Sequence, residues 1–155
     1  MNSAAPARTV DAQKLQTLVT DIFNAAGVPT PNAARIAECL VLADLRGVAS
    51  HGVSLLSIYL ERIRRGMVER VPEFAMSEPS PVAALLDGGN GFGFLAATKA
   101  MTMATERAEQ FGIGMVGVKN SNHFGMAACY LLQAVEAGYA ALVFTNASPA
   151  MPVWV

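Results

Sequence analysis

Residues 113–138 have the sequence IGMVGVKNSNHFGMAACYLLQAVEAG, and this stretch decides the fold class. Its apolar run, 113–118, predicts a buried strand, and the polar turn 119–125 follows it. Apolar residues at helical spacing then predict a helix over 126–137 that Gly138 ends. A buried strand followed by a polar turn and a helix is typical of a helix-covered sheet. The stretch therefore predicts an α/β fold.

The same alternation extends on both sides of this stretch. The apolar runs 82–86 and 140–144 predict two more buried strands, and residues 95–110 predict an alanine-rich helix. Residues 87–91, Asp-Gly-Gly-Asn-Gly, predict a flexible loop, because the glycine spacing departs from that of a dinucleotide-binding loop. Three strands make a small sheet and the final residues, 151–155, are apolar, so we expect a truncated chain.

The N-terminal part is predicted to be a small helical domain. Apolar residues at three-and-four spacing predict helices over 11–26, 30–46 and 53–65, each followed by glycine, with Thr30 as the N-cap of the second and Pro31 at its first position. The mixed charges and prolines of residues 67–80 predict a linker. We therefore expect a helical domain over residues 1–70 and a partial α/β domain over residues 71–155.

Composition excludes several classes of protein. The net charge of −1 provides no large basic face for nucleic acid. No apolar run approaches the ~18 residues of a membrane span, and the N-terminus lacks the apolar core of a signal peptide. Cys39 and Cys129 lie in apolar helical patterns without C-x-x-C spacing, which predicts reduced core cysteines. We expect a cytoplasmic protein that binds neither nucleic acid nor membrane.

Only two histidines occur in the chain, and each lies in a short polar stretch beside glycine. His51, in Ser50-His51-Gly52, is expected to be an exposed loop histidine beside a capping serine; the alternative places it at a helix N-terminus. His123 follows a predicted strand and is expected to open a helix whose free N–H groups could bind phosphate or carboxylate. The alternative there is an asparagine-rich capping turn. Imidazole titrates near neutral pH, so both side chains suit proton transfer.

Two other chemistries fit these residues less well. A serine hydrolase that uses Ser50 or Ser121 needs a nucleophile within reach of a histidine, yet there is no G-x-S-x-G elbow. Adjacent side chains such as Ser50 and His51 also point apart on most backbones. A metal site needs further ligands, and neither an H-x-x-x-H nor a C-x-x-C pattern accompanies the histidines. We expect no metal site.

Four motifs in register resemble the malate/L-lactate dehydrogenase family, NAD(P)-dependent 2-hydroxyacid and imino-acid oxidoreductases without an ordinary Rossmann fold. The motifs lie in residues 44–66, 87–93, 117–125 and 145–149, and the resemblance covers residues 10–154. Family members are roughly twice as long. The resemblance implies a helical domain followed by the first part of a mixed, helix-covered cofactor domain. It also implies NAD or NADP as cofactor, a small 2-oxo or 2-hydroxy acid as substrate, and a homodimer.

The resemblance implies site residues as well. His51 would be the acid/base group at the substrate oxygen with Ser50 as its relay, although His123 is an alternative catalytic base. The residues expected to contact the cofactor follow one another in the chain: His123, Phe124, Gly125, Met126 and Ala127. Those expected to contact the substrate are Arg46, Asn122 and Thr145.

One position departs from the family pattern. Many members have an arginine four residues after the first histidine, where this chain has Leu55. Leucine cannot pair with a carboxylate, so Arg46, Arg62 or a residue outside this chain would have to bind the acid. The alternative to a dehydrogenase is therefore a non-catalytic fragment that retains the fold and the dimer surface.

Overall fold

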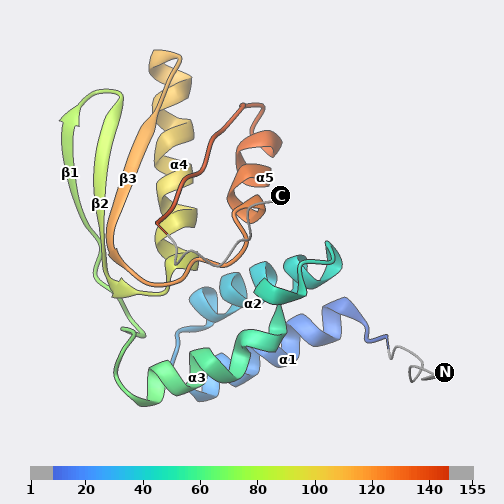
Figure 1. The fold of residues 1–155 in the computed structure, drawn as a ribbon. Coiled ribbons are helices and arrows are strands. Elements are labelled where there is room, and N and C mark those ends of the chain that lie inside the picture. The colour runs from blue at the N-terminus through green and yellow to red at the C-terminus, as the bar shows by residue number, and fades with distance from the viewer. Residues whose placement is uncertain (1–8, 147–155) are drawn as a thin grey trace, which may run out of the picture.

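The structure, a computed structural model, describes residues 9–146 and shows a layer of helices packed against a small sheet unit (Figure 1). The helical layer contains α1 (Ala12–Ala25), α2 (Thr30–Leu45), the short 3₁₀ turns η1 (Ala49–His51) and η2 (Val53–Leu55), and α3 (Leu56–Arg64). The sheet unit contains β1 (Ala75–Ser80), β2 (Ala83–Gly91), α4 (Gly93–Phe111), β3 (Met115–Ser121) and α5 (Ala128–Glu136).

The first two helices form where the sequence predicts them. The Asp11 side chain accepts a hydrogen bond from the backbone N–H of Lys14 at 2.8 Å and so caps α1, and Gly27 follows α1 with a φ of 86°. At the second helix the predicted cap is off by one residue. Pro29 occupies the N-cap position and Thr30 is already helical. A proline fits the N-cap, because the backbone N–H that it lacks would have no partner within the helix.

The sheet is mixed, which confirms the predicted α/β class. β1 pairs with β2 antiparallel, and β2 pairs with β3 in parallel through the crossover helix α4. α4 covers one face of the sheet, burying Ala84 and Leu86 of β2 (Figure 1). Helix α5 packs on α4 and α2, not on the strands. The carboxyl ends of β2 and β3 consequently point toward the helical layer (Figure 1).

Two segments predicted to be irregular are strands. The predicted linker 67–80 contains β1, which is exposed along nearly its whole length and therefore shows no apolar alternation. As the edge strand of the sheet it tolerates Pro79. The predicted loop 87–91 is the end of β2: Asp87 pairs with Lys119 of β3, and Gly91 pairs with Ser121.

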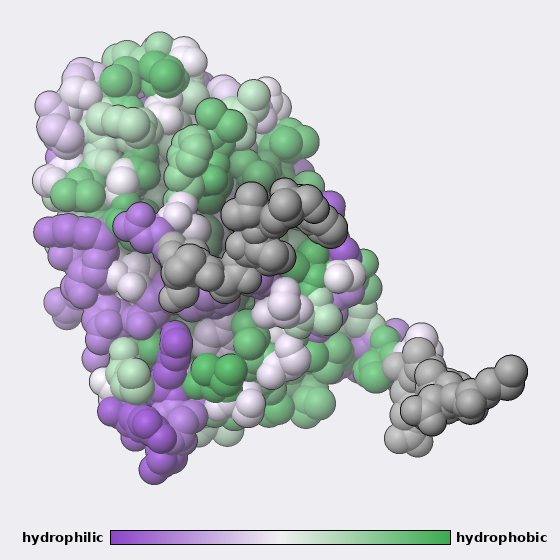
Figure 2. Space-filling view, in the orientation of Figure 1, coloured by the Kyte–Doolittle hydropathy of each residue, from purple (hydrophilic) through white to green (hydrophobic). Residues whose placement is uncertain are grey.

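The predicted burial is confirmed for one face of β2, where Ala84 and Leu86 are buried, but it is wrong for β3. Within residues 9–146 no helix packs on the second face of the sheet, and Met115 of β3 is 65% exposed. Residues 140–144 form no strand in the structure. Their side chains alternate: Ala141 and Val143 pack against the core, whereas Leu142 and Phe144 are exposed. Figure 2 shows hydrophobic residues, in green, on the surface of the upper part of the molecule, where the sheet unit lies. An apolar run does predict an extended chain here, but it cannot reveal whether a partner strand lies beside it.

One core joins the two layers. Phe23 of α1, Leu40 of α2 and Tyr130 of α5 are fully buried together with Phe92 and Phe94 at the start of α4. Each such side chain contributes about 1.5–3 kcal/mol through burial, so the junction holds the layers together. The division of the chain at residue 70 therefore stays a prediction.

The cysteines lie in this shared core. Cys39 of α2 and Cys129 of α5 are buried free thiols, and the Cys129 Sγ lies 3.7 Å from the Cys39 carbonyl oxygen. The prediction of core cysteines is thereby confirmed. Across residues 9–146, none of the helices is both long and apolar enough to span a membrane.

Candidate active site

The Ser-His-Gly turn is held by an aspartate at the end of α2. The Asp44 Oδ2 accepts the backbone N–H of Val53 at 2.9 Å. A Cβ on Gly52 would lie 1.9 Å from the Asp44 Oδ1, so only glycine lets the carboxylate approach this closely. The chain between α2 and α3 therefore forms two 3₁₀ turns, and α3 begins at Leu56. The helical segment predicted from about residue 53 begins there as a 3₁₀ turn and becomes α-helical at Leu56. His51 ends η1, so the alternative that placed it at a helix N-terminus is wrong.

Ser50 and His51 contact each other. The Ser50 Oγ lies 2.9 Å from the His51 Nδ1 within the tight turn η1, so the expectation that these side chains point apart is wrong. A serine hydrolase still fits poorly. In a triad the nucleophile and a carboxylate occupy opposite ring nitrogens of the histidine, whereas here the hydroxyl lies on Nδ1, the nitrogen where the carboxylate belongs.

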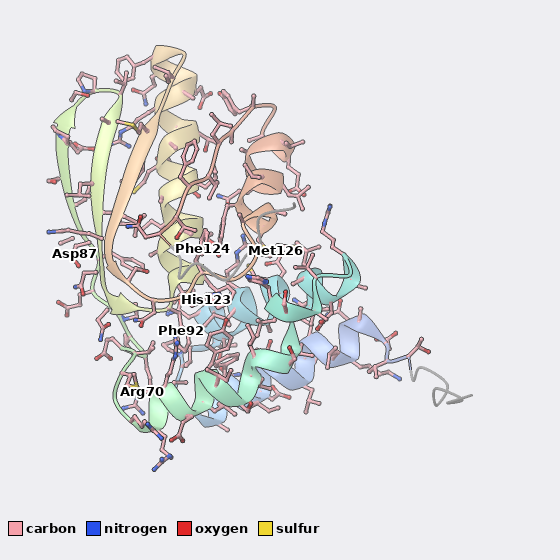
Figure 3. The ribbon with its side chains drawn as sticks, in the orientation of Figure 1. Arg70, Asp87, Phe92, His123, Phe124 and Met126 are labelled. Atoms are coloured by element: carbon pink, nitrogen blue, oxygen red, sulfur yellow. The ribbon has the colours of Figure 1, made fainter. Side chains whose placement is uncertain are left out.

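The two histidines lie face to face, although 72 residues separate them in the chain. The rings of His51 and His123 are stacked, with centroids 5.6 Å apart and planes 25° from parallel. His51 comes from the helical layer and His123 from the segment that follows β3, so the pair lies where the layers meet. Figure 3 labels His123 at this junction. The structure thus brings together Ser50, His51 and His123, the three predicted catalytic residues.

His123 lies in a loop and not at a helix start. α5 begins five residues later, at Ala128. Between them Gly125 has a φ of 73°, and a Cβ there would lie 2.4 Å from the Phe94 ring. The chain must therefore turn against the core before the helix can begin. The prediction that His123 opens a helix with free N–H groups around it is wrong.

Tyr59 is a site residue that the sequence reasoning missed. Its hydroxyl lies 2.7 Å from the Nδ1 of His123, while the side chain as a whole is only 2% exposed. Sequence placed Tyr59 on the apolar side of the third helix, where it belongs to the core. The available signal was its hydroxyl, because a buried tyrosine usually has a hydrogen-bond partner.

The surroundings of His123 disfavour its charged form. Burial of part of the ring lowers the pKa of His123, and the neighbouring His51 and Arg62 lower it further. Burial also raises the pKa of Tyr59, so its hydroxyl keeps its proton. At neutral pH the site therefore contains a neutral imidazole at position 123 beside a protonated phenol.

The segment expected to contact the cofactor is packed mainly into the protein. Phe124 stacks on Tyr130 with ring centroids 5.4 Å apart, and Gly125 and Met126 are buried. Figure 3 labels Phe124 and Met126 near the junction of the layers. The roles of His123 to Ala127 stay predictions.

The residues expected to bind substrate are not gathered around the histidines by any recorded contact within residues 9–146. The Asn122 Nδ2 donates to Asn90 and to the Gly91 carbonyl oxygen over 2.9–3.2 Å, which ties the loop to the end of β2. Arg46 is exposed where α2 ends. Thr145 is exposed, and its hydroxyl donates a hydrogen bond to the carbonyl oxygen of Asn146 at 3.2 Å.

The glycine-rich end of β2 is packed by the protein itself. A Cβ on Gly93 would lie 2.1 Å from the Asn122 carbonyl oxygen, and one on Gly91 would lie 2.5 Å from Pro72. These glycines permit close backbone contact between β2, α4 and the histidine loop, so they do not form a phosphate cradle. In the described part of the chain no three histidine, cysteine or acidic side chains gather as metal ligands.

Comparisons with known proteins identify relatives. A family model described as malate/L-lactate dehydrogenase matches residues 10–155. The chain is 39% identical over 140 residues to malate dehydrogenase of Pyrococcus abyssi, covering 90% of this chain and 39% of the relative. It is 34% identical over 140 residues to ureidoglycolate dehydrogenase (NAD(+)) of Escherichia coli, covering 90% and 40%. The solved malate dehydrogenase of Pyrococcus horikoshii aligns with a TM-score of 0.82 and 38% identity, over 84% of this chain and 38% of that one. The chain thus spans about two fifths of the length of these relatives.

Proposed function

The chain belongs to the malate/L-lactate dehydrogenase family, and from this membership we propose that it supplies the acid/base half of an NAD(P)-dependent dehydrogenase for small 2-hydroxy acids. The observation that carries the proposal is the stacked pair of His51 and His123, 5.6 Å apart at the junction of the two layers. Two imidazoles at one solvent-accessible site suit a reaction in which a substrate oxygen gains or loses a proton.

The reaction explains why such groups are needed. A bound nicotinamide would supply or accept the hydride at the substrate carbon. When a 2-oxo acid is reduced, negative charge develops on its carbonyl oxygen, and a positioned acid must deliver a proton there. His51 is suited to this task because its Nδ1 faces the Ser50 hydroxyl, which can relay a proton, while the other ring nitrogen remains available. In the reverse direction neutral His51 would accept the proton of the hydroxy acid.

The cofactor choice is part of the same proposal. The residues around the histidines fit the substrate end of the reaction, since imidazole and hydroxyl donors suit an oxygen that becomes negative. The backbone of residues 123–127, directly beside that pair, is where the nicotinamide would bind. We propose either NAD or NADP as the cofactor. We also propose that the enzyme is a homodimer in the cytoplasm.

Binding of the substrate carboxylate requires a cation. Position 55 holds a leucine whose side chain packs against the core, so it cannot serve. Arg62, two helical turns further along α3, already exerts its charge on His123. We assign the carboxylate to Arg62 or Arg46, and expect replacement of the effective residue to raise KM more than it lowers kcat.

An activity assay tests the proposal. The product of the full reading frame that contains this chain is incubated with NADH or NADPH and a panel of 2-oxo acids, and cofactor oxidation is followed by absorbance. We expect turnover with at least one pair, and His51→Ala to lower it by ~10²-fold or more. Arg64→Ala is the matched control, because Arg64 is exposed and pairs only with Glu61 on the outer side of α3.

The absence of turnover across the whole panel would refute the dehydrogenase proposal and favour the non-catalytic alternative. A second measurement identifies the cofactor. Whichever of NADH and NADPH binds the folded chain raises its melting temperature, since ligands that bind only the native state stabilise it.

A further inference from the structure

We propose that Tyr59 is a positioning residue that fixes His123 as the tautomer with its hydrogen on Nε2. His123 then presents a constant hydrogen-bond donor to an acceptor oxygen of the substrate, while His51 exchanges the proton. The role of His123 as a donor to substrate rests on the proposed function, whereas the effect of Tyr59 on the His123 tautomer does not depend on it. The geometry points to this division of labour because each histidine has a different partner on Nδ1: a buried phenol for His123 and an exposed serine for His51.

The direction of the hydrogen bond follows from burial. The Tyr59 hydroxyl and the His123 Nδ1 are 2.7 Å apart, and His123 is the partner recorded for this hydroxyl in the described part of the chain. The phenol keeps its proton, because burial of the side chain disfavours phenolate. A hydroxyl hydrogen in a buried place must find an acceptor, so Tyr59 donates and the Nδ1 of His123 accepts.

The tautomer is then determined. A neutral imidazole carries one hydrogen, and if Nδ1 accepts a hydrogen bond, that hydrogen lies on Nε2. Partial burial of the ring favours neutral His123, and the neighbouring His51 from η1 and Arg62 from α3 act in the same direction. The uncharged Tyr59 phenol from α3 also faces the ring. None of these groups is an acid that would stabilise an imidazolium. The ring therefore donates from Nε2 throughout the reaction.

The position of the hydroxyl is fixed by the core. The Tyr59 ring meets the edges of Phe92 at 5.9 Å and Phe94 at 5.6 Å, both near perpendicular. It also lies 6.1 Å from the His123 ring, with planes 29° apart. Removal of the hydroxyl alone leaves these aromatic contacts in place, so Tyr59→Phe isolates the hydrogen bond from the packing.

His51 lacks such a constraint. Its partner, Ser50, is exposed, and a serine hydroxyl that reaches water can either donate to the ring or accept from it. The hydrogen of neutral His51 can therefore reside on either nitrogen. This freedom is what an acid/base group requires, because its reactive nitrogen must be protonated in one half of the reaction and free in the other.

The test measures the tautomers directly by nitrogen-15 NMR of the two histidines, the only ones in the chain. Above its pKa, His123 in the unmodified protein should show a bare, hydrogen-bonded Nδ1 and a protonated Nε2. In Tyr59→Phe the ratio of the Nε2–H to the Nδ1–H form should fall by about tenfold, since a hydrogen bond worth ~1.4 kcal/mol changes an equilibrium by that factor.

Ser50→Ala is the matched control. It removes the hydroxyl from the other histidine, so it should change the His51 signals and leave the His123 tautomer as it was. A hydrogen on the Nδ1 of His123 in the unmodified protein would overturn the proposal, and that measurement requires no variant to fold. An unchanged His123 tautomer in folded Tyr59→Phe would overturn it as well.

The NMR result is independent of catalysis, so the two proposals can fail separately. If His123 carries its hydrogen on Nε2 but the protein shows no turnover, the dehydrogenase proposal and the donor role of His123 are refuted. The effect of Tyr59 on the His123 tautomer is not. Turnover in a protein whose His123 carries its hydrogen on Nδ1 refutes the positioning role alone. In an active preparation, Tyr59→Phe should lower kcat/KM while the pH profile that reports His51 stays in place.

Discussion

Substitution of Gly52 by alanine should uncouple the Ser-His-Gly turn from α2. Gly52 has φ −92° and ψ −159°, an extended conformation open to any residue, so the backbone itself does not require glycine. The obstacle is the Asp44 carboxylate, 1.9 Å from the position of the new Cβ. Asp44 must rotate away and lose its bond to the Val53 N–H.

The size of the effect follows from two opposing contributions. Loss of a hydrogen bond to a half-exposed carboxylate costs about 1–2 kcal/mol, near the lower end for charged partners. Alanine recovers about 0.4–1 kcal/mol by restricting the unfolded chain. Gly52→Ala should therefore lower the free energy of unfolding by about 1 kcal/mol, a fall in melting temperature of roughly 3 °C for a chain of this size.

A double-mutant cycle with Asp44→Ala tests this reasoning by thermal unfolding. Once the carboxylate is gone, Gly52→Ala no longer meets the three atoms nearest to the new Cβ and should stabilise the protein by about 0.5 kcal/mol. The sign of the alanine effect thus reverses between the two backgrounds. If Gly52→Ala costs the same free energy in both, the close approach of Asp44 is not the reason for glycine at this position, and the argument is refuted.

Three further predictions concern the core, the histidine loop and pH. Leu40→Ala should lower the free energy of unfolding by about 2–5 kcal/mol, because the side chain is fully buried between the layers, and denaturant titration checks this. Gly125→Ala combines a φ of 73° with a Cβ only 2.4 Å from Phe94, so calorimetry should show a larger loss than the same change at Gly66, where the φ is 65° and nothing lies within 4 Å. The pKa of His123 in the folded protein lies below its unfolded value near 6.5, so the unfolded state binds more protons as pH falls through that value. The free energy of unfolding should therefore decrease from about pH 7 downward, and the variant His123→Gln should lose this part of the pH dependence.

Local signals in the sequence predicted most of the fold. The first two helices were predicted from their helical spacing and from the glycine after each, and the α/β class from the strand, turn and helix order of residues 113–138. The structure confirms both. β1 was missed because an exposed edge strand has no apolar alternation to detect. Residues 140–144 were predicted as a strand because an apolar run shows an extended chain but not its hydrogen-bond partner.

The site was predictable in its residues but not in its contacts. Two polar, glycine-flanked histidines indicate a site, yet nothing local shows that their rings stack, because the contact depends on how the two layers pack. The same holds for Tyr59, whose spacing marks it as a core residue and whose hydrogen bond spans 64 residues. Asp44 is a further example: its motif is recognisable, but its role becomes clear only from the absent Cβ of Gly52.

The edge contacts that Phe92 and Phe94 make with Tyr59 have a consequence for mutational scans. Substitutions at these two positions that nearly conserve the side-chain volume, such as Phe to Leu, would cost little stability but would still move the phenol that contacts His123. Neither phenylalanine approaches a reacting atom through any recorded contact. In a scan that measures turnover, such variants would therefore lose activity although their loss of stability is too small to unfold the chain. In a scan that measures protein abundance, the same variants would differ little from the unmodified protein. The positions at which turnover falls and abundance does not would identify the interior residues that support the site.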